Sequence, residues 1–209
     1  MPPVYSDHDI IDRLNLSVDL IPPGQLNRPG VPIAPDYVTI HDTGNDVPGA
    51  DAVAHAGYLR SEAGASWHFT VDDRRSIRHL PLREKALHAR RGNRRSIGLN
   101  VCMQRGVDQP ATNARAALLT AVILHQIAQD VDRVVPHAHW SATARKPVFM
   151  RDWDGFLGMV DQRMALLPDG FNAGAALKIL PGECGLALPD EPDIDDAVVA
   201  AGVNRFLSN

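Results

Sequence analysis

The sequence predicts an α/β domain built on a central mixed β-sheet that is flanked by helices. Short runs of β-branched and aromatic residues alternate along the chain with longer, alanine-rich segments whose apolar residues recur at helical spacing. The alternation continues to about residue 167, and such a pattern favours helices that connect the strands of one sheet. After Pro168 the chain is rich in turn-forming residues and has no clear period.

The individual elements follow from local patterns. The first strand is YVTIH, residues 37–41, and a helix is expected over 49–62, where Ala52, Ala56 and Leu59 share one face. A hairpin is expected next, with its strands at 67–71 and 76–80 on either side of an Asp-Asp turn. The later elements are a strand at 94–103, a helix at 113–130, a short strand that leads into a loop at 131–140, and a helix at 151–167.

These patterns divide the chain into three parts. Residues 1–36 are an N-terminal arm that becomes rich in Pro and Gly, expected to be extended and to pack on the domain without forming an element. Residues 37–167 are the domain itself. Residues 168–209 are a C-terminal extension, too short for a full independent domain, in which 193–207 could form one short helix.

Composition limits the choice of partners. The 209 residues carry a formal net charge of -4, which gives no whole-chain argument for binding nucleic acid. Positive charge is concentrated in residues 74–95, which hold nine Arg and Lys side chains. This segment is interpreted either as a solvated face or as a patch that faces a polyanionic surface.

Two cysteines, Cys102 and Cys184, make neither a disulfide framework nor a CxxC zinc site. Cys102 lies in an apolar, strand-like run and is expected to be a buried free thiol. The N-terminus has no apolar core after a basic start, so no signal peptide is expected, and no run approaches the roughly 18 apolar residues of a membrane helix. We therefore expect synthesis in the cytoplasm and no membrane insertion.

His41 ends the apolar strand at 37–41 and is followed by polar and turn-forming residues. A histidine on the rigid end of a strand is well placed to hold a metal or to move a proton. A catalytic zinc takes about three protein ligands and keeps a position open for water, and these ligands can converge from distant strands. His137, which follows the short strand VVP, is a candidate partner for His41, although spacing alone also allows both to be structural residues.

Five segments follow one another in a recognisable order: NRPGVPIAPDYVTIHDTGN, GADAVAHAGYL, SWHFTVDDRRSIRHLPL, GNRRSIGLNVC and VVPHAHWS. Over roughly residues 20–165 the chain resembles the N-acetylmuramoyl-L-alanine amidases of bacteriophages and bacilli, which are related to peptidoglycan-recognition proteins. The resemblance implies their fold, with a zinc ion held in a groove on one face. It also implies that the zinc activates a water that cleaves the bond between N-acetylmuramic acid and L-alanine.

The same resemblance assigns roles to particular residues. It makes His41 and His137 zinc ligands, and it makes peptidoglycan or muropeptides the partner. Four residues lie in motifs that line or support the substrate groove of the family, and we expect them to take part in substrate binding: Asn45, Trp67, His68 and His88. Two of these have an alternative interpretation, since Trp67 can be a core residue and His68 a structural hydrogen-bonding residue. The family's WHAG segment is LHAR here, so that His88 is retained.

Two positions depart from the family pattern. The residue before Pro147 is Lys146, where relatives have the Cys or Asp that is the third zinc ligand, and a protonated Lys has no lone pair to donate. Asn100 stands where relatives often have a Glu that acts on the catalytic water, and Asn cannot take a proton. Asn100 and Lys146 thus occupy the family's catalytic and ligand positions with changed chemistry.

The third zinc ligand is therefore not identified from the sequence. His139, Asp152 and Asp154 are candidates that stand near the expected position without occupying it. Arg145 or Lys146 could instead supply the cation that stabilises the developing oxyanion in some amidases.

Three functions remain open, and the sequence does not decide whether the chain is an enzyme. The first is a zinc amidase with an unusual third ligand. The second is a catalytically inactive protein of the amidase fold that binds peptidoglycan, and the third is a structural component, for example of a phage particle. The expected site of action is the bacterial cell wall after release from the cytoplasm, or the virion itself.

Overall fold

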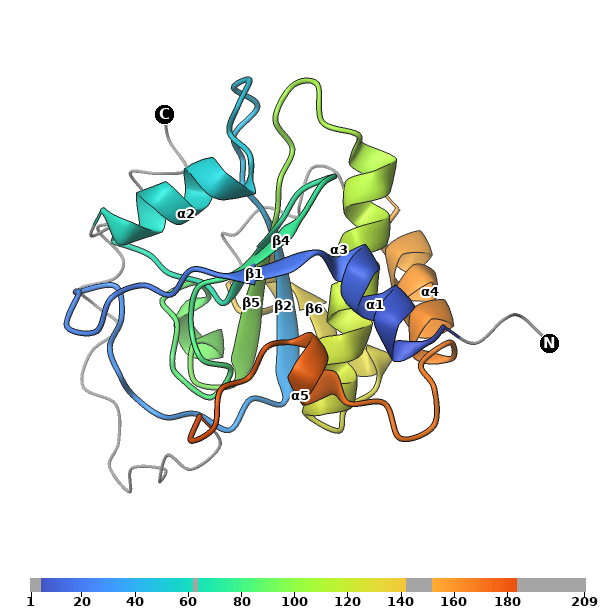
Figure 1. The fold of residues 1–209 in the computed structure, drawn as a ribbon. Coiled ribbons are helices and arrows are strands. Elements are labelled where there is room, and N and C mark those ends of the chain that lie inside the picture. Colours follow the sequence, from blue (N-terminus) through green and yellow to red (C-terminus); the bar gives the residue numbers. More distant parts are fainter. Residues whose placement is uncertain (1–4, 62–63, 142–151, 184–209) are drawn as a thin grey trace.

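The computed structural model describes residues 5–61, 64–141 and 152–183. Within these residues, six strands form one sheet in the order β1-β4-β3-β5-β2-β6 (Figure 1). The elements in chain order are α1 (Asp7–Leu14), β1 (Leu16–Val18), β2 (Tyr37–Asp42), α2 (Ala52–Arg60), β3 (Phe69–Val71), β4 (Ser76–Arg78), η1 (Arg90–Gly92), β5 (Ser96–Val101), α3 (Gln109–Gln126), η2 (Val131–Arg133), β6 (Val134–Pro136), η3 (His137–His139), α4 (Trp153–Met164) and α5 (Ala173–Ala176).

The sheet is mixed, which confirms the prediction. Strands β3, β5, β2 and β6 run parallel to one another, β4 pairs antiparallel with β3, and β1 lies parallel to β4 at the edge. Carboxyl ends of parallel strands meet at the same edge of a sheet. The residues that end β2, β5 and β6 are therefore brought to one place.

The two faces of the sheet differ in chemistry. Successive side chains of a strand point to opposite faces, so Val38 and Ile40 of β2 point one way and Thr39 and His41 the other. The Val38 face joins the main hydrophobic core beneath α3, against which α1, α4 and α5 pack. On the other side, α2 packs over β3 and β4, so the sheet lies between α2 and the group around α3 (Figure 1). None of the described helices is long and apolar enough to cross a membrane.

Helix α3 is displaced from its predicted range of 113–130. It begins earlier because Asp108 accepts a hydrogen bond from the Ala111 amide at 3.0 Å, which caps the first turn. It ends earlier because Ala128 adopts a left-handed backbone conformation with a φ of 54°. Both boundaries come from local capping, which is harder to detect in sequence than the Ala-rich body of the helix.

The prediction that residues 1–36 form no element is wrong for its first half. Ser6 and Asp9 form a capping box that starts α1, and Ile10 and Leu14 on one side of this helix are fully buried. Asn15 then takes a left-handed conformation, with a φ of 41°, and directs the chain into β1. A helix of 8 residues and a strand of 3 leave only a weak periodic signal in the sequence.

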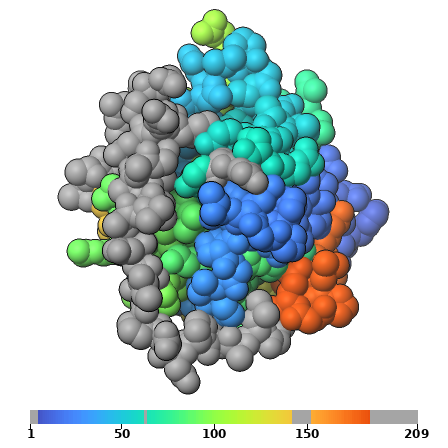
Figure 2. All heavy atoms as spheres, turned by 90° about the vertical axis from the view of Figure 1, so that its left-hand side faces the viewer, coloured from blue at the N-terminus to red at the C-terminus, as the bar shows by residue number. Residues whose placement is uncertain are grey.

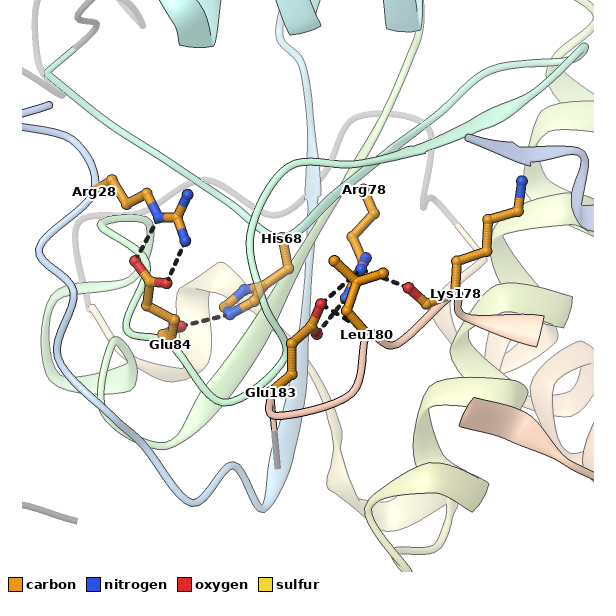
Figure 3. Close-up of polar contacts among 7 residues, drawn as sticks. All are labelled: Arg28, His68, Arg78, Glu84, Lys178, Leu180 and Glu183. Carbon is orange, nitrogen blue, oxygen red and sulfur yellow. Dashed lines mark hydrogen bonds and ion pairs between the residues drawn. The ribbon is translucent and has the colours of Figure 1, made fainter. Parts of the chain in front are cut away.

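The second half of this segment, residues 19–36, packs on the domain outside helices and strands, as expected. The amides of Asp19 and Ile21 donate hydrogen bonds to the backbone carbonyls of residues 78 and 79. The Ile33 amide donates to the Arg83 carbonyl. Arg28 adds a two-armed ion pair with Glu84, at 2.9 Å for each contact (Figure 3). Seen from the side that carries α2, the blue N-terminal segment lies next to cyan α2 on the same face of the molecule (Figure 2).

Residues 168–183 pack on the same core as the predicted domain. Phe171, Ala173 and Leu177 are buried against it. The fully buried guanidinium of Arg78 on β4 bonds to the Glu183 carboxylate at 2.6 and 3.0 Å and to the Lys178 carbonyl at 2.6 Å (Figure 3). The helix expected at 193–207 lies outside the described residues.

Arg78 also shows that the arginine-rich segment 74–95 is not one continuous face. Arg78 and Lys85 are buried, whereas Arg90, Arg91 and Arg95 are exposed. Neither interpretation of the segment therefore describes all of it.

The predicted buried thiol is confirmed, because Cys102 is fully inaccessible. Burial is the main cause that raises the pKa of this thiol.

Candidate active site

Three imidazole rings meet at the carboxyl edge of the sheet. His41 is near the end of β2, and His137 is the first residue after β6, where the pairing of Ile40 with Pro136 sets the two histidines side by side. Their ring centroids are 4.7 Å apart. His88, from the loop before β5, approaches from a third direction, and its Nδ1 atom lies 2.9 Å from Nε2 of His41. The structure therefore brings together His41, His137 and His88.

The surroundings of all three imidazoles favour the neutral form. Burial lowers the pKa of His41 well below its usual value, and the neighbouring His88 and His137 lower it further. Burial likewise dominates the lowered pKa of His88, and it lowers the pKa of His137 together with the cation of Arg90. Neutral imidazole is the form that binds a metal, so His41 and His137 need lose no proton to act as ligands.

The loop that carries His88 is fixed from both sides. The Asn93 side-chain oxygen accepts hydrogen bonds from the amides of His88 and Ala89, at 2.9 and 2.6 Å. On the sheet side, a Cβ atom on Gly98 would lie only 2.8 Å from the ring of His88. Glycine at position 98 therefore lets the imidazole lie directly against β5.

Asn100 lies beside the histidines. It is the register partner of His41 across the β2–β5 pair, so both side chains project to the same face. Its exposed fraction is 7%, similar to the 9% of His41. Asn100, which the sequence places at the family's catalytic position, thus lies beside His41. Lys146 is outside the described residues.

The three alternative candidates for the third zinc ligand are placed elsewhere. His139 packs against Tyr37 at the start of β2 and against Trp140, with ring centroids 5.7 and 4.7 Å away. Asp152 caps α4 by accepting from the Gly155 amide at 2.8 Å, and Asp154 is exposed on the same helix. Helix α4 packs on α3, which covers the Val38 face of the sheet. The two aspartates therefore lie on the side of the sheet opposite to the His41 side chain.

Of the residues expected to bind substrate, Trp67 and His68 are buried. The Trp67 indole N–H donates to the Thr70 hydroxyl at 2.7 Å. His68 accepts from the Gly98 amide at 3.0 Å and donates to the Glu84 carbonyl at 2.9 Å (Figure 3). Burial lowers the pKa of His68 to about 4. With both ring nitrogens bonded inside the protein, His68 has the structural hydrogen-bonding role of its alternative interpretation, and Trp67 is buried in the core.

Asn45 is the partly exposed member of the expected substrate-binding set. Its side-chain oxygen accepts a hydrogen bond from the Val47 amide at 3.1 Å, which shapes the loop that follows β2. His88 belongs to the interior instead, with an exposed fraction of 7%.

Comparison with known proteins agrees with this geometry. Residues 31–148 match the model of the N-acetylmuramoyl-L-alanine amidase family. The chain belongs to this family. It is 40% identical over 148 residues to the N-acetylmuramoyl-L-alanine amidase XlyA of Bacillus subtilis (strain 168), covering 68% of this chain and 50% of that protein. It is 36% identical over 150 residues to the amidase CwlH of the same strain, covering 69% of this chain and 60% of that protein.

The fold of an amidase catalytic domain is also shared. The structure of the catalytic domain of XlyA aligns with a TM-score of 0.67 and 39% identity, covering 70% of this chain and 99% of that domain. The chain spans half to three-fifths of the full length of the two curated relatives. The amidase-like fold predicted from the sequence is therefore confirmed.

The donor set of this amidase-family chain suits zinc in part. His41 and His137 offer two neutral, adjacent imidazoles at rigid strand ends, which are donors that zinc prefers. In residues 5–61, 64–141 and 152–183, no group of three His, Cys, Asp or Glu side chains is arranged to hold a metal ion. Any third protein ligand would have to come from elsewhere in the chain.

Several residues of the site were not predicted from the sequence. Trp140 donates its indole N–H to the Thr39 hydroxyl at 2.8 Å, which ties η3 to β2 beside His41. A Cβ on Gly92 would lie 2.7 Å from the Trp140 ring, so this glycine provides the space. The one available signal was the alternation of polar Thr39 and His41 with apolar Val38 and Ile40, which marks a polar face on a buried strand.

Another buried histidine, His79, is expected to make the stability of the fold depend on pH. Burial lowers the pKa of His79 to about 3. Its Nε2 accepts from the Thr70 hydroxyl at 2.8 Å, and that hydroxyl accepts from the Trp67 indole. An unfolded chain has a histidine pKa of about 6.5, so between these values the unfolded state binds more protons and stability falls as the pH falls.

We expect the free energy of unfolding to drop by about 2 kcal/mol for this one histidine between about pH 7.5 and about pH 5. Urea unfolding at several pH values measures the slope. In the His79→Gln variant, which keeps an acceptor for Thr70 without a titrating group, the slope should decrease by about one proton in this range. An unchanged slope would show that folding does not lower the pKa of His79.

The backbone of Arg90 is strained, and a substitution can test this. Its φ is 49°, a left-handed conformation that glycine adopts without cost, and glycine is the residue of the family's WHAG segment at this position. We expect Arg90→Gly to raise the free energy of unfolding by at most about 1 kcal/mol. We also expect the pKa of His137 to rise, because the Arg90 cation adds to the effect of burial in lowering it.

NMR titration of the metal-free protein measures the pKa of His137 in this variant. Arg91→Ala, at the exposed neighbouring position, is the control and should leave the His137 pKa unchanged. A His137 pKa that stays the same in Arg90→Gly would show that the guanidinium does not act on the site.

Proposed function

We propose that this chain hydrolyses the amide bond between N-acetylmuramic acid and L-alanine in peptidoglycan, at a zinc ion held by His41 and His137. The observation that carries the proposal is the pair of adjacent imidazoles, buried His41 and partly exposed His137, with ring centroids 4.7 Å apart at the carboxyl ends of β2 and β6. This pair lies inside the segment that matches the amidase family.

The chain's own residues would divide the work as follows. His41 and His137 fix the position of the metal, which when bound supplies a Lewis acid for the amide carbonyl and lowers the pKa of water. Asn100, on the same face as His41, can orient a water or a substrate amide through its carbonyl and its N–H groups. It cannot remove a proton, so proton transfer would fall to another group.

One observation favours a second candidate function, the binding of peptidoglycan without hydrolysis. Asn100 stands next to His41 where relatives often carry a Glu, and an amide has no basic oxygen or nitrogen to act on the attacking water. Together with Lys146 in place of the third ligand, this change would leave a fold that still recognises muropeptides but does not cut them.

Digestion of purified peptidoglycan distinguishes the two functions. Wild-type protein with zinc is expected to release stem peptides with a free L-alanine amino group, identified by mass, and a chelator should abolish this release. If no such peptide forms but the protein still sediments with peptidoglycan, the binding function is correct and the hydrolytic one is wrong. Absence of both cleavage and binding would contradict both proposals.

The setting that fits this activity is the bacterial cell wall. The chain would reach its substrate after release from the cytoplasm, or as part of a phage particle. Lysis of cells from outside, compared with lysis only after the membrane is permeabilised, tests from which side the protein reaches the wall.

A further inference from the structure

A directed chain of hydrogen bonds runs behind the candidate metal site. Nε2 of His41 lies 2.9 Å from Nδ1 of His88, and Nε2 of His88 lies 3.3 Å from the carbonyl oxygen of Ser96. A carbonyl oxygen can only accept, so the proton of the neutral His88 ring is on Nε2 and its Nδ1 is an acceptor. The hydrogen between the two rings must then come from Nε2 of His41.

We propose that His88 is a positioning residue that fixes the tautomer and the ring direction of His41. With the proton of His41 held on Nε2, the lone pair of Nδ1 is left free to bind a metal. The proposal rests on the proposed function insofar as that metal is zinc. It replaces the sequence-based expectation that His88 contacts substrate.

The surroundings show that this arrangement is built into the fold. His88 is 7% exposed, and its backbone is held by the side chain of Asn93, which is itself fully buried. Gly98 is the residue that lets its ring lie against β5. Burial, the Asn93 side chain and Gly98 thus fix the His88 imidazole, whose ring contacts His41. A histidine ligand whose second nitrogen is hydrogen-bonded to such a fixed partner loses little freedom when it binds metal.

The same hydrogen bonds indicate that His88 positions His41 and does not itself coordinate the metal. His88 uses both ring nitrogens inside the protein, one as an acceptor and one as a donor. Among the described residues, the three imidazoles do not form a group that could hold a metal together. His88 therefore acts on the metal through His41.

The first test needs no zinc. Nitrogen NMR shifts of the metal-free protein report which ring nitrogen of a neutral histidine carries the proton. We expect His41 to be protonated on Nε2 in the wild type, and we expect this preference to be lost in His88→Ala. Protonation of His41 on Nδ1 in the wild type would overturn the proposal even if every variant failed to fold.

The second test measures zinc affinity by competition with a chromophoric chelator. His88→Ala is expected to bind zinc about 10- to 100-fold more weakly than the wild type, the usual effect of losing an outer-shell partner of a ligand. His88→Asn should recover most of the affinity, because its side-chain oxygen can take the place of Nδ1 as an acceptor. His55→Ala, which removes a similarly buried histidine from α2, is the matched control and should bind zinc like the wild type.

The outcomes separate this proposal from the function on which it builds. Equal zinc affinity in His88→Ala and the wild type would overturn the positioning role. Affinity in His88→Asn as weak as in His88→Ala would overturn it too, because the imidazole itself would then be required. A wild-type protein that binds no zinc would contradict the proposed function, while the NMR result would still decide the role of His88.

Discussion

Replacing His41 with alanine is expected to abolish zinc binding and amidase activity together. Among the described residues, the proposed ligands are His41 and His137, so removing His41 leaves His137 as a single donor. The loss of activity should exceed the roughly 10- to 100-fold that follows removal of an outer-shell partner. Release of L-alanine-ended peptides from peptidoglycan, measured beside the zinc content of the same sample, tests this expectation.

The matched control for this substitution is His8→Ala. The His8 side chain is 84% exposed on α1 and lies far from the site in the fold, so zinc content and activity should match the wild type. Thermal unfolding of both variants shows whether they remain folded. A folded His41→Ala protein with wild-type activity would place the catalytic centre elsewhere.

Replacing Glu183 with alanine is expected to destabilise the fold by about 3–5 kcal/mol. The substitution leaves the Arg78 guanidinium buried with the Lys178 carbonyl as a remaining partner (Figure 3). A buried cation without its counter-ion carries the full cost of desolvation, which is why breaking one side of such a pair costs more than the pair contributes. Urea unfolding of the two proteins at neutral pH measures the difference.

A surface ion pair supplies the matched control. Arg95 and Asp36 also form a contact between guanidinium and carboxylate, but their side chains are 54% and 30% exposed. Asp36→Ala should therefore cost at most about 1 kcal/mol. Replacing both Arg78 and Glu183 with methionine should cost less than Glu183→Ala alone, because no charge is left buried.

The same experiment tests how the chain is divided. If Glu183→Ala is as mild as Asp36→Ala, then residues 168–183 contribute little to the stability of the sheet, as a separate extension would. A large loss would show that this segment is part of the folded unit, since Arg78 lies on β4.

The sequence predicted the centre of the fold better than its margins. Strands β2 and β5 have six residues each and strong β-branched or apolar patterns, so their position was clear. Strand β1 has three residues and is stabilised by pairing with β4, about 60 residues away in the chain, which no local pattern reveals. The buried pairing of Arg78 with Glu183 is likewise set by the tertiary fold.

The candidate site was also predicted in part. His41 and His137 stood out because His41 ends one apolar strand and His137 follows another, and the parallel register of β2 and β6 does bring them together. The direction of the bond from His41 to His88 depends on the Ser96 carbonyl, and the approach of His88 depends on Gly98. Such relations arise from register and loop packing, so the sequence pointed to the two candidate ligands but not to the contacts that orient them.

The zinc content of the purified protein, dialysed against trace zinc and measured by elemental analysis, tests the central claim most directly. The account predicts about one zinc per chain in the wild type and none in His41→Ala or His137→Ala. A wild-type protein without zinc, or a variant that keeps it, would contradict the proposal that these two histidines hold the metal.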